Sequence, residues 1–97
     1  MCDDRRERLM RRVRHWSDLV GAQPRIVRVR HMKRKWGSCS AAGVITLAED
    51  LADQAPEFQD FVIAHELLHL RVPRHGKVFN ALMSAHLPEW RKQDILR

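Results

Sequence analysis

Apolar residues recur at helical spacing near the beginning of the chain. They are Leu9, Val13, Trp16 and Val20. Because residues three and four apart share one face of a helix, this apolar stripe among arginines predicts an amphipathic helix. Asp3 and Asp4 are suitable residues to cap its beginning, and Gly21 is a suitable residue to end it.

Strict alternation replaces the helical period after this first segment. Residues 26–32 place valines on one face and arginines on the other, which predicts a half-buried strand. Residues 36–40 and 44–47 predict two further strands, with a turn at residues 41–43 between them. We expect the three strands to form a small antiparallel sheet.

The second half of the sequence is predominantly helical. A helix is predicted for residues 56–70, with Pro56 in its first turn and Pro73 preventing its continuation. A third helix is predicted for residues 77–87, and a short last helix for residues 89–96. The order of helix, sheet and helices predicts an α+β fold.

Length and cysteine content narrow the class of protein. A chain of 97 residues is expected to form one domain that spans residues 1–97. The sequence has no segment apolar and long enough for a membrane span, and its beginning does not resemble a secretory signal. Cys2 and Cys39 are too few for a disulfide scaffold. We therefore expect a cytoplasmic protein with no membrane partner.

The net charge of +6 is unevenly distributed along the chain. Residues 25–35 contain six Arg or Lys residues and no acid, whereas residues 49–60 contain five acids and no base. Because basic surfaces attract phosphates, one hypothesis is contact with nucleic acid through residues 25–35. The alternative is a solvated surface, since no helix-turn-helix or other reader motif accompanies the charge.

The helix predicted for residues 56–70 holds three polar side chains in apolar surroundings. Residues 61–70 are apolar on nearly every side, which predicts a buried helix. Burial of His65, Glu66 and His69 without partners would be unfavourable. A bound metal ion would compensate for this cost.

The spacing of these residues favours zinc. His65 and His69 are four residues apart, so they share one helix face, where two imidazoles can bind one zinc ion. Glu66 is rotated by about 100° around the helix axis relative to His65. From this position its carboxylate can act on a water activated by the metal without binding the metal itself. The alternative is two core histidines hydrogen-bonded to the backbone, with Glu66 paired to an arginine.

A third zinc ligand is expected beyond the end of this helix. His75 follows His69 by six residues, and Pro73 would stiffen a turn that brings the chain back over the helix end. His86 and Glu89 are the alternative ligands. His86 is also a candidate contact for the oxyanion or the substrate, although its place on the apolar side of its helix more often indicates a packed core histidine.

Three histidine ligands would leave one zinc position open, as in catalytic rather than structural sites. The predicted function is a zinc metallopeptidase that hydrolyses peptide bonds through a zinc-activated water, with Glu66 as general base and a peptide or protein as substrate. The alternatives are a nucleic-acid-associated protein with a mainly structural zinc, a protease recruited to DNA, and a hydrolase that acts on another bond.

The sequence resembles the YgjP-like metallopeptidase domain, which is related to the SprT-like and WLM zinc peptidases. The matching stretches are RVRHMKRKWGSCS (28–40), GVITLAEDL (43–51), FVIAHELLHLRVPRHGKVF (61–79) and LPEWRKQDIL (87–96). The resemblance implies a minimal zincin-like fold, zinc on His65, His69 and His75, and catalysis by Glu66. It also implies that the strand at residues 44–47 lies near the substrate cleft, where an extended peptide could add as a further strand.

Overall fold

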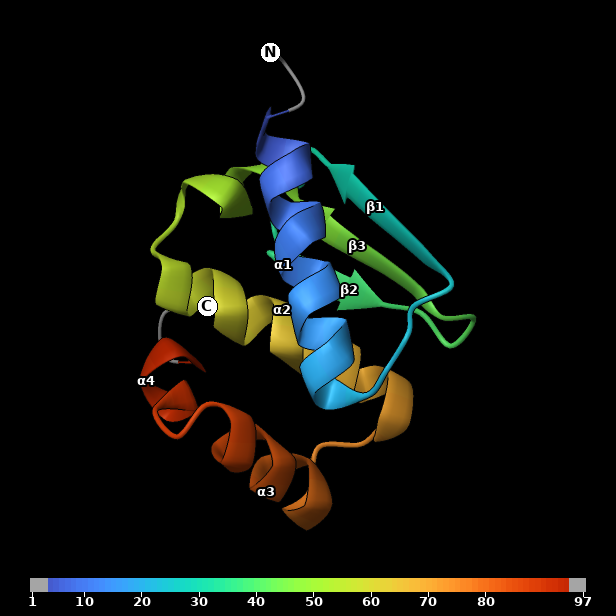
Figure 1. The fold of residues 1–97 in the computed structure, drawn as a ribbon, viewed down its shortest axis with the longest axis vertical. Helices are drawn as coiled ribbons and strands as arrows, with labels where there is room; N and C mark the ends of the chain where they lie inside the picture. The colour runs from blue at the N-terminus through green and yellow to red at the C-terminus, as the bar shows by residue number, and fades with distance from the viewer. Residues whose placement is uncertain (1–3, 95–97) are drawn as a thin grey trace.

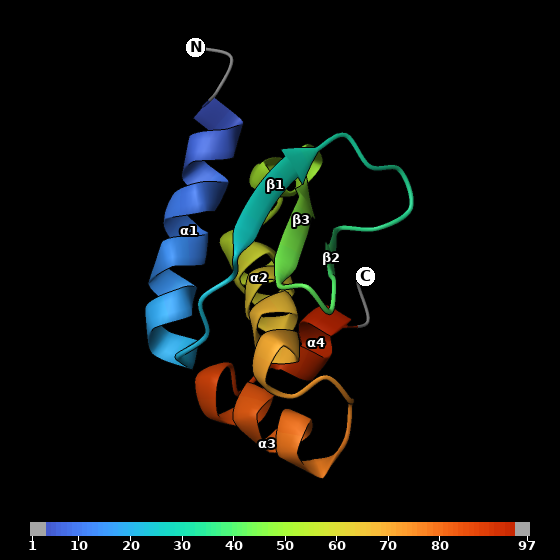
Figure 2. The same ribbon diagram turned by 90° about the vertical axis from the view of Figure 1, so that its right-hand side faces the viewer.

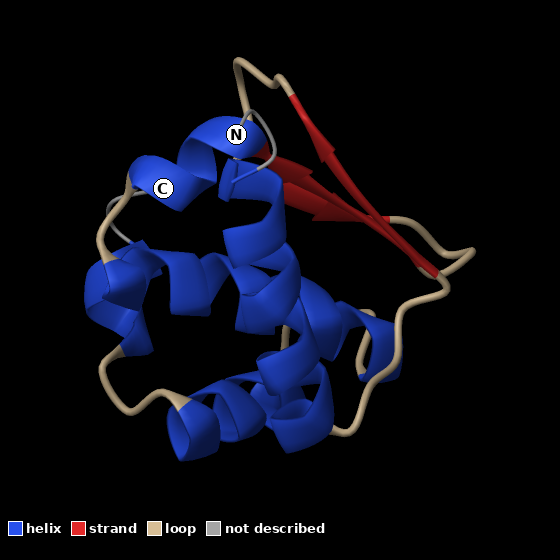
Figure 3. Cartoon of the chain, turned by 45° about the horizontal axis from the view of Figure 1, so that its top comes forward, coloured by secondary structure: helices blue, strands red, loops and turns tan. Residues whose placement is uncertain are grey.

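The structure is a computed structural model that describes residues 4–94. Its elements are α1 (Asp4–Val20), β1 (Ile26–Arg30), β2 (Gly37–Cys39), β3 (Val44–Ala48), the 3-10 helix η1 (Glu49–Asp53), α2 (Pro56–Arg71), α3 (Lys77–His86) and α4 (Trp90–Asp94) (Figure 1). The sheet forms one side of the molecule and the helices gather on the other (Figure 3). The cap expected at Asp3 and the last residues of the helix predicted to end at residue 96 lie outside the described residues.

The sheet is mixed, so the prediction of an antiparallel sheet was wrong. The strand order is β1-β3-β2. β3 pairs with β2 antiparallel, with Ile45 opposite Cys39, but it pairs with β1 parallel, with Val44 opposite Ile26. β3 takes the central position because it carries the sheet's fully buried side chains, including Ile45 and Leu47, whereas alternate residues of β1 are exposed.

The connection between β1 and β2 explains the parallel pairing. Residues 31–36 form a loop that extends away from β1 and carries the chain to the far edge of the sheet (Figure 2). β2 and β3 then form a hairpin, with Gly43 in the turn at a φ of 86°. β3 therefore enters the gap between its two neighbours and runs in the same direction as β1.

α2 is the central helix of the core. Every residue from Phe61 to Leu68 is buried, which confirms the prediction of a buried helix. The apolar stripe of α1 packs against it, and Leu9, Val13, Trp16 and Val20 are all buried. Within the described residues, no helix combines the length and the apolar character needed to cross a membrane.

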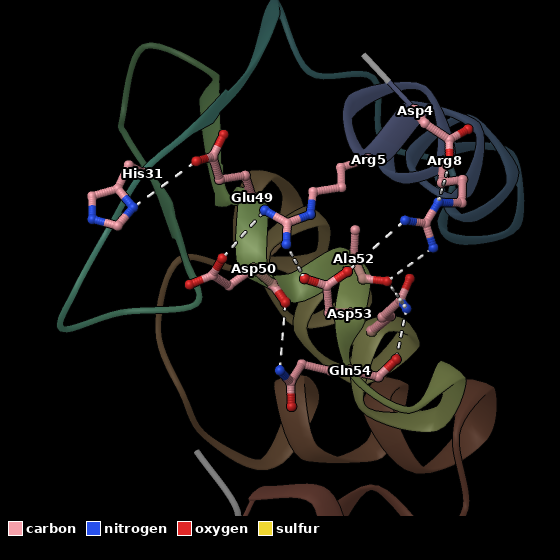
Figure 4. A network of polar contacts seen from close by, with 10 residues as sticks. Asp4, Arg5, Arg8, His31, Glu49, Asp50, Ala52, Asp53 and Gln54 are labelled. Atoms are coloured by element: carbon pink, nitrogen blue, oxygen red, sulfur yellow. Dashed lines mark hydrogen bonds and ion pairs between the residues drawn. The ribbon is translucent and has the colours of Figure 1, made fainter. Parts of the chain in front are cut away.

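Ion pairs join the first helix to the acidic segment that follows the sheet (Figure 4). Arg5 of α1 pairs with both Asp50 and Asp53 of η1, and Arg8 donates a hydrogen bond of 3.2 Å to the carbonyl oxygen of Ala52. The arginines of α1 thus neutralise much of the negative charge of residues 49–60.

Candidate metal centre

Three histidines meet beside the C-terminal half of α2. His65 and His69 lie one turn apart on α2, and His75 comes from the loop before α3. One ring nitrogen of each lies within 4.8 Å of those of the other two. The structure thus brings together the three residues that the sequence analysis selected as ligands.

This donor set fits a tetrahedral metal ion such as zinc. Two nitrogen ligands at 2.0–2.1 Å from a tetrahedral zinc ion lie roughly 3.3 Å apart. The Nε2 atoms of His69 and His75 are 2.8 Å apart, so a small outward movement of one ring gives that separation. The ring centroids of the three histidines are 4.6 to 5.0 Å apart, and each ring comes close enough to share one ion.

His69 is oriented by the turn that ends α2. Its Nδ1 atom lies 3.2 Å from the carbonyl oxygen of Pro73. A proton on Nδ1 donates to that oxygen and leaves the lone pair of Nε2 directed at the cluster, as in many metal sites. The pKa of His69 is lowered, mainly by burial and next by the charge of His65, with Glu66 acting in the opposite direction. The neutral, metal-binding form of the ring is therefore favoured.

The ring of Phe79 supports all three imidazoles. Phe79 is in α3 and is only 1% exposed. Its ring centroid lies 5.3 Å from that of His65, 4.9 Å from that of His69 and 4.7 Å from that of His75. The histidines therefore have an apolar side, which restricts their ring orientations.

Glu66 lies against the cluster in a nearly buried position. Its Oε2 atom is 3.4 Å from Nδ1 of His65, and the residue is 7% exposed. Gly37 of β2 allows the sheet to approach this side chain, because a Cβ atom at Gly37 would lie 3.2 Å from Cγ of Glu66. On the same strand, burial and then the charge of Glu66 raise the pKa of the Cys39 thiol, so Cys39 is in its neutral form.

Three hollows surround the centre. The first, of about 400 Å³, is lined by Arg34, Lys35, Trp36, Gly37, Val62 and Glu66. The second, of about 420 Å³, is lined by Cys39, Ser40, Ala41, His69, Leu70 and Pro73. The third, of about 350 Å³, is lined by His65, His75, Phe79, Asn80, Trp90 and Asp94. The first two lie at opposite ends of β2.

The two alternative ligands are not part of this cluster. The ring of His86 packs edge-on against Trp16 of α1 at 6.2 Å, and His86 lines none of the three hollows. Glu89 is exposed and pairs with Lys92 at 2.6 Å, which lowers the pKa of its carboxyl group. The structure thus places His86 in the packing between α1 and α3, as its apolar helix face indicated.

Residues 2–95 match the sequence model of the YgjP-like metallopeptidase domain. The chain belongs to this metallopeptidase family. None of the curated proteins compared with the chain matches it. The assignment covers the whole of the helix that carries His65, Glu66 and His69, as well as the loop that carries His75.

Solved structures similar to this YgjP-like domain include two metallopeptidase zymogens. The crystal structure of the zymogen of Pyrococcus abyssi abylysin has a TM-score of 0.75 and 26% sequence identity, and the match covers 90% of this chain and 87% of abylysin. The zymogen of Methanocaldococcus jannaschii jannalysin has a TM-score of 0.77 at 19% identity, with 90% of each chain covered. The α+β fold, with its three-stranded sheet and helices, is thus that of small metallopeptidases.

Three residues of the centre of this YgjP-like domain were not predicted in their present roles. Gly37 was assigned only to a strand, although a glycine inside a strand often marks the close approach of another part of the chain. Phe79 was assigned to the apolar side of its helix, and its contact with the histidines has no sequence signal beyond its position four residues after His75. The carbonyl group of Pro73 has no signal at all, because every residue carries one.

Proposed function

We propose that this YgjP-like domain is a zinc-dependent metallopeptidase of the zincin type, whose HExxH motif is the sequence HELLH at residues 65–69. His65, His69 and His75 hold the zinc ion, and Glu66 is the general base. The observation that carries the proposal is the convergence of three ring nitrogens within 4.8 Å of one another beside the nearly buried Glu66. Membership of a metallopeptidase family supports the hydrolysis of peptide bonds as the reaction.

The chemistry follows from the positions of these residues. Bound zinc would polarise the carbonyl group of the substrate and lower the pKa of a water towards about 7. Glu66 accepts the proton of the attacking water and then delivers it to the nitrogen of the leaving amine. The contact of Glu66 with Nδ1 of His65, and the close approach of the strand at Gly37, which leaves no room there for a Cβ atom, keep its carboxylate beside the cluster.

The free edge of β2 is the surface on which we place the substrate. The resemblance implies that an extended peptide could add as a further strand near residues 44–47. These residues belong to β3, which is the central strand, so both of its edges are already paired within the sheet. β2 is an edge strand, and its ends border the hollows beside Glu66 and His69. An extended peptide that adds to β2 would therefore pass the metal centre.

Other expectations from the sequence stay predictions. We treat residues 1–97 as one domain and expect it to act in the cytoplasm. Neither the family nor the structural neighbours support nucleic-acid binding through residues 25–35. We do not include His86 in the proposed catalytic apparatus, because its ring packs against Trp16.

The substitution Glu66→Gln tests the proposed function. The variant should bind zinc as the wild type does, but its cleavage of an unfolded protein, followed by mass spectrometry of the products, should fall by about 10²–10⁴-fold. Glu57→Gln is the matched control, since Glu57 is an exposed residue in the first turn of the same helix. Cleavage by zinc-loaded Glu66→Gln at the wild-type rate, or no cleavage by the zinc-loaded wild type, would contradict the proposal.

A further inference from the structure

The hollow beside Glu66 has a basic mouth. Arg34 and Lys35 line it and are exposed, whereas Glu66, its acidic residue, is nearly buried. Both basic residues lie near the end of the loop that connects β1 to β2 (Figure 2). The hollow thus has two cationic side chains at its opening and a carboxylate within it.

Trp36 holds this end of the loop in place. Its carbonyl oxygen accepts a hydrogen bond of 2.9 Å from the backbone N–H of Ala48. Its ring packs edge-on against Phe58 of α2, with the ring centroids 5.4 Å apart. Arg34 and Lys35 therefore extend from a backbone that is fixed next to the candidate active site.

The positive charge at this opening has no ion-pair partner among the residues that the structure describes. Among residues 4–94, no ion pair involves Arg34 or Lys35. The acids of residues 49–60 could have provided partners, but Asp50 and Asp53 pair with Arg5 of α1. Arg34 and Lys35 thus remain available to an acidic ligand.

We propose that this hollow is a specificity subsite for an acidic side chain of the substrate, an Asp or Glu within two residues of the bond that is cleaved. The position of that bond rests on the proposed function. A peptide paired with β2 places side chains at the ends of this strand, and Gly37 at one end borders the hollow. A carboxylate there forms charge-assisted hydrogen bonds with Arg34 and Lys35.

The shape of the site favours a single carboxylate over a nucleic-acid backbone. Arg28 and Arg30 are on the exposed face of β1 and do not line the hollow, so only two of the six basic residues at positions 25–35 contribute to it. The negative charge of Glu66 in the same hollow disfavours a polyanion. An acidic side chain held at the opening keeps its distance from Glu66 and still reaches both cations.

Peptide binding tests this subsite without requiring turnover. Zinc-loaded Glu66→Gln is titrated with fluorescent peptides that each carry one Glu, at a different position, as their only charged side chain, and with matched peptides that carry Gln there. At low salt we expect one or two neighbouring Glu positions to strengthen binding roughly tenfold. The double substitution Arg34→Gln and Lys35→Gln should remove this advantage, while Lys33→Gln, in the same loop but outside the hollow, should retain it.

Three results would overturn the subsite. These are equal affinities for the Glu and Gln peptides at every position, a Glu advantage that survives the double substitution, and binding of a short single-stranded oligonucleotide in preference to every Glu peptide. Incubation of the best Glu peptide with the wild type separates this inference from the proposed function. Cleavage within two residues of the Glu supports both, whereas a Glu advantage without any cleavage supports the acidic subsite and contradicts the peptidase.

Discussion

The Nδ1 atom of His69 lies 3.2 Å from the carbonyl oxygen of Pro73. This contact links a residue of α2 to the turn that leads to His75, two residues further along the chain. The same turn therefore orients one imidazole and delivers another. It explains how a short segment can build most of a candidate metal centre: the helix supplies two rings, and its C-terminal turn fixes the second ring and positions the third.

The substitution His75→Ala should remove most of the zinc affinity. Substitution of a residue that only supports a ligand typically lowers metal affinity by about 10–100-fold. Loss of the ligand itself should lower it further, so we expect the zinc affinity to fall by more than about 100-fold. Because His75 is exposed, the free energy of unfolding of the metal-free protein should change little. Competition with a chelating dye measures the affinity, and His31→Ala, at another exposed histidine, is the control. Full zinc occupancy in the His75 variant would exclude it as a ligand.

Phe79 should affect both stability and metal binding. The substitution Phe79→Leu removes part of a buried ring that contacts all three histidines, and it should cost about 1–2 kcal/mol in the free energy of unfolding. Zinc affinity should fall by about tenfold, because the rings lose their common support. Val78→Ala is the control, since Val78 is 62% exposed. An unchanged zinc affinity in Phe79→Leu would show that Phe79 supports the fold alone.

Gly37 should be sensitive to the addition of a single methyl group. A Cβ atom there would lie 3.2 Å from side-chain atoms of Glu66, Leu47 and Val62, all of which are buried. Gly37→Ala should therefore cost about 1–3 kcal/mol in the free energy of unfolding and lower kcat by displacing Glu66. Gly76→Ala provides the comparison, because a Cβ atom at Gly76 meets nothing within 4 Å. Urea unfolding and peptide cleavage measure the two effects, and equal behaviour of the two variants would contradict this role for Gly37.

The lowered pKa of His69 predicts how the stability of the metal-free protein depends on pH. As pH falls below the ordinary histidine pKa of 6.5, the unfolded chain takes up a proton at His69 before the folded protein does. The unfolded state then binds more protons, so this contribution to stability is present above pH 6.5 and is lost as pH falls through the lowered pKa. Urea unfolding between about pH 5 and 7.5 should give a shallower dependence in His69→Gln than in the wild type. An identical pH dependence of the free energy of unfolding in the two proteins would contradict a lowered pKa of His69.

The helices and the clustering of the three histidines were predictable from the sequence, because both rest on local spacing. The period of Leu9, Val13 and Trp16 determines which face of α1 packs, and the four-residue spacing of His65 and His69 places them on one face of α2. The approach of His75 to the other two histidines could be predicted because only a short turn separates it from α2.

The strand order was not predictable in the same way. Pairing between β1 and β3 joins segments separated by the whole of β2, and no local pattern in either strand specifies a parallel neighbour. The short helix η1 was also missed, since five residues contain too little periodicity to be recognised. Its burial of Leu51 and its ion pairs with α1 depend on the tertiary fold.

The location of the metal tests the account most directly. We expect anomalous diffraction at the zinc edge, from crystals of the zinc-loaded protein, to place one ion at 2.0–2.1 Å from a ring nitrogen of each of His65, His69 and His75. The coordination position that the three histidines leave open should face Glu66. A protein that takes up no zinc, or a zinc ion held elsewhere while these three imidazoles point away from one another, would contradict the account.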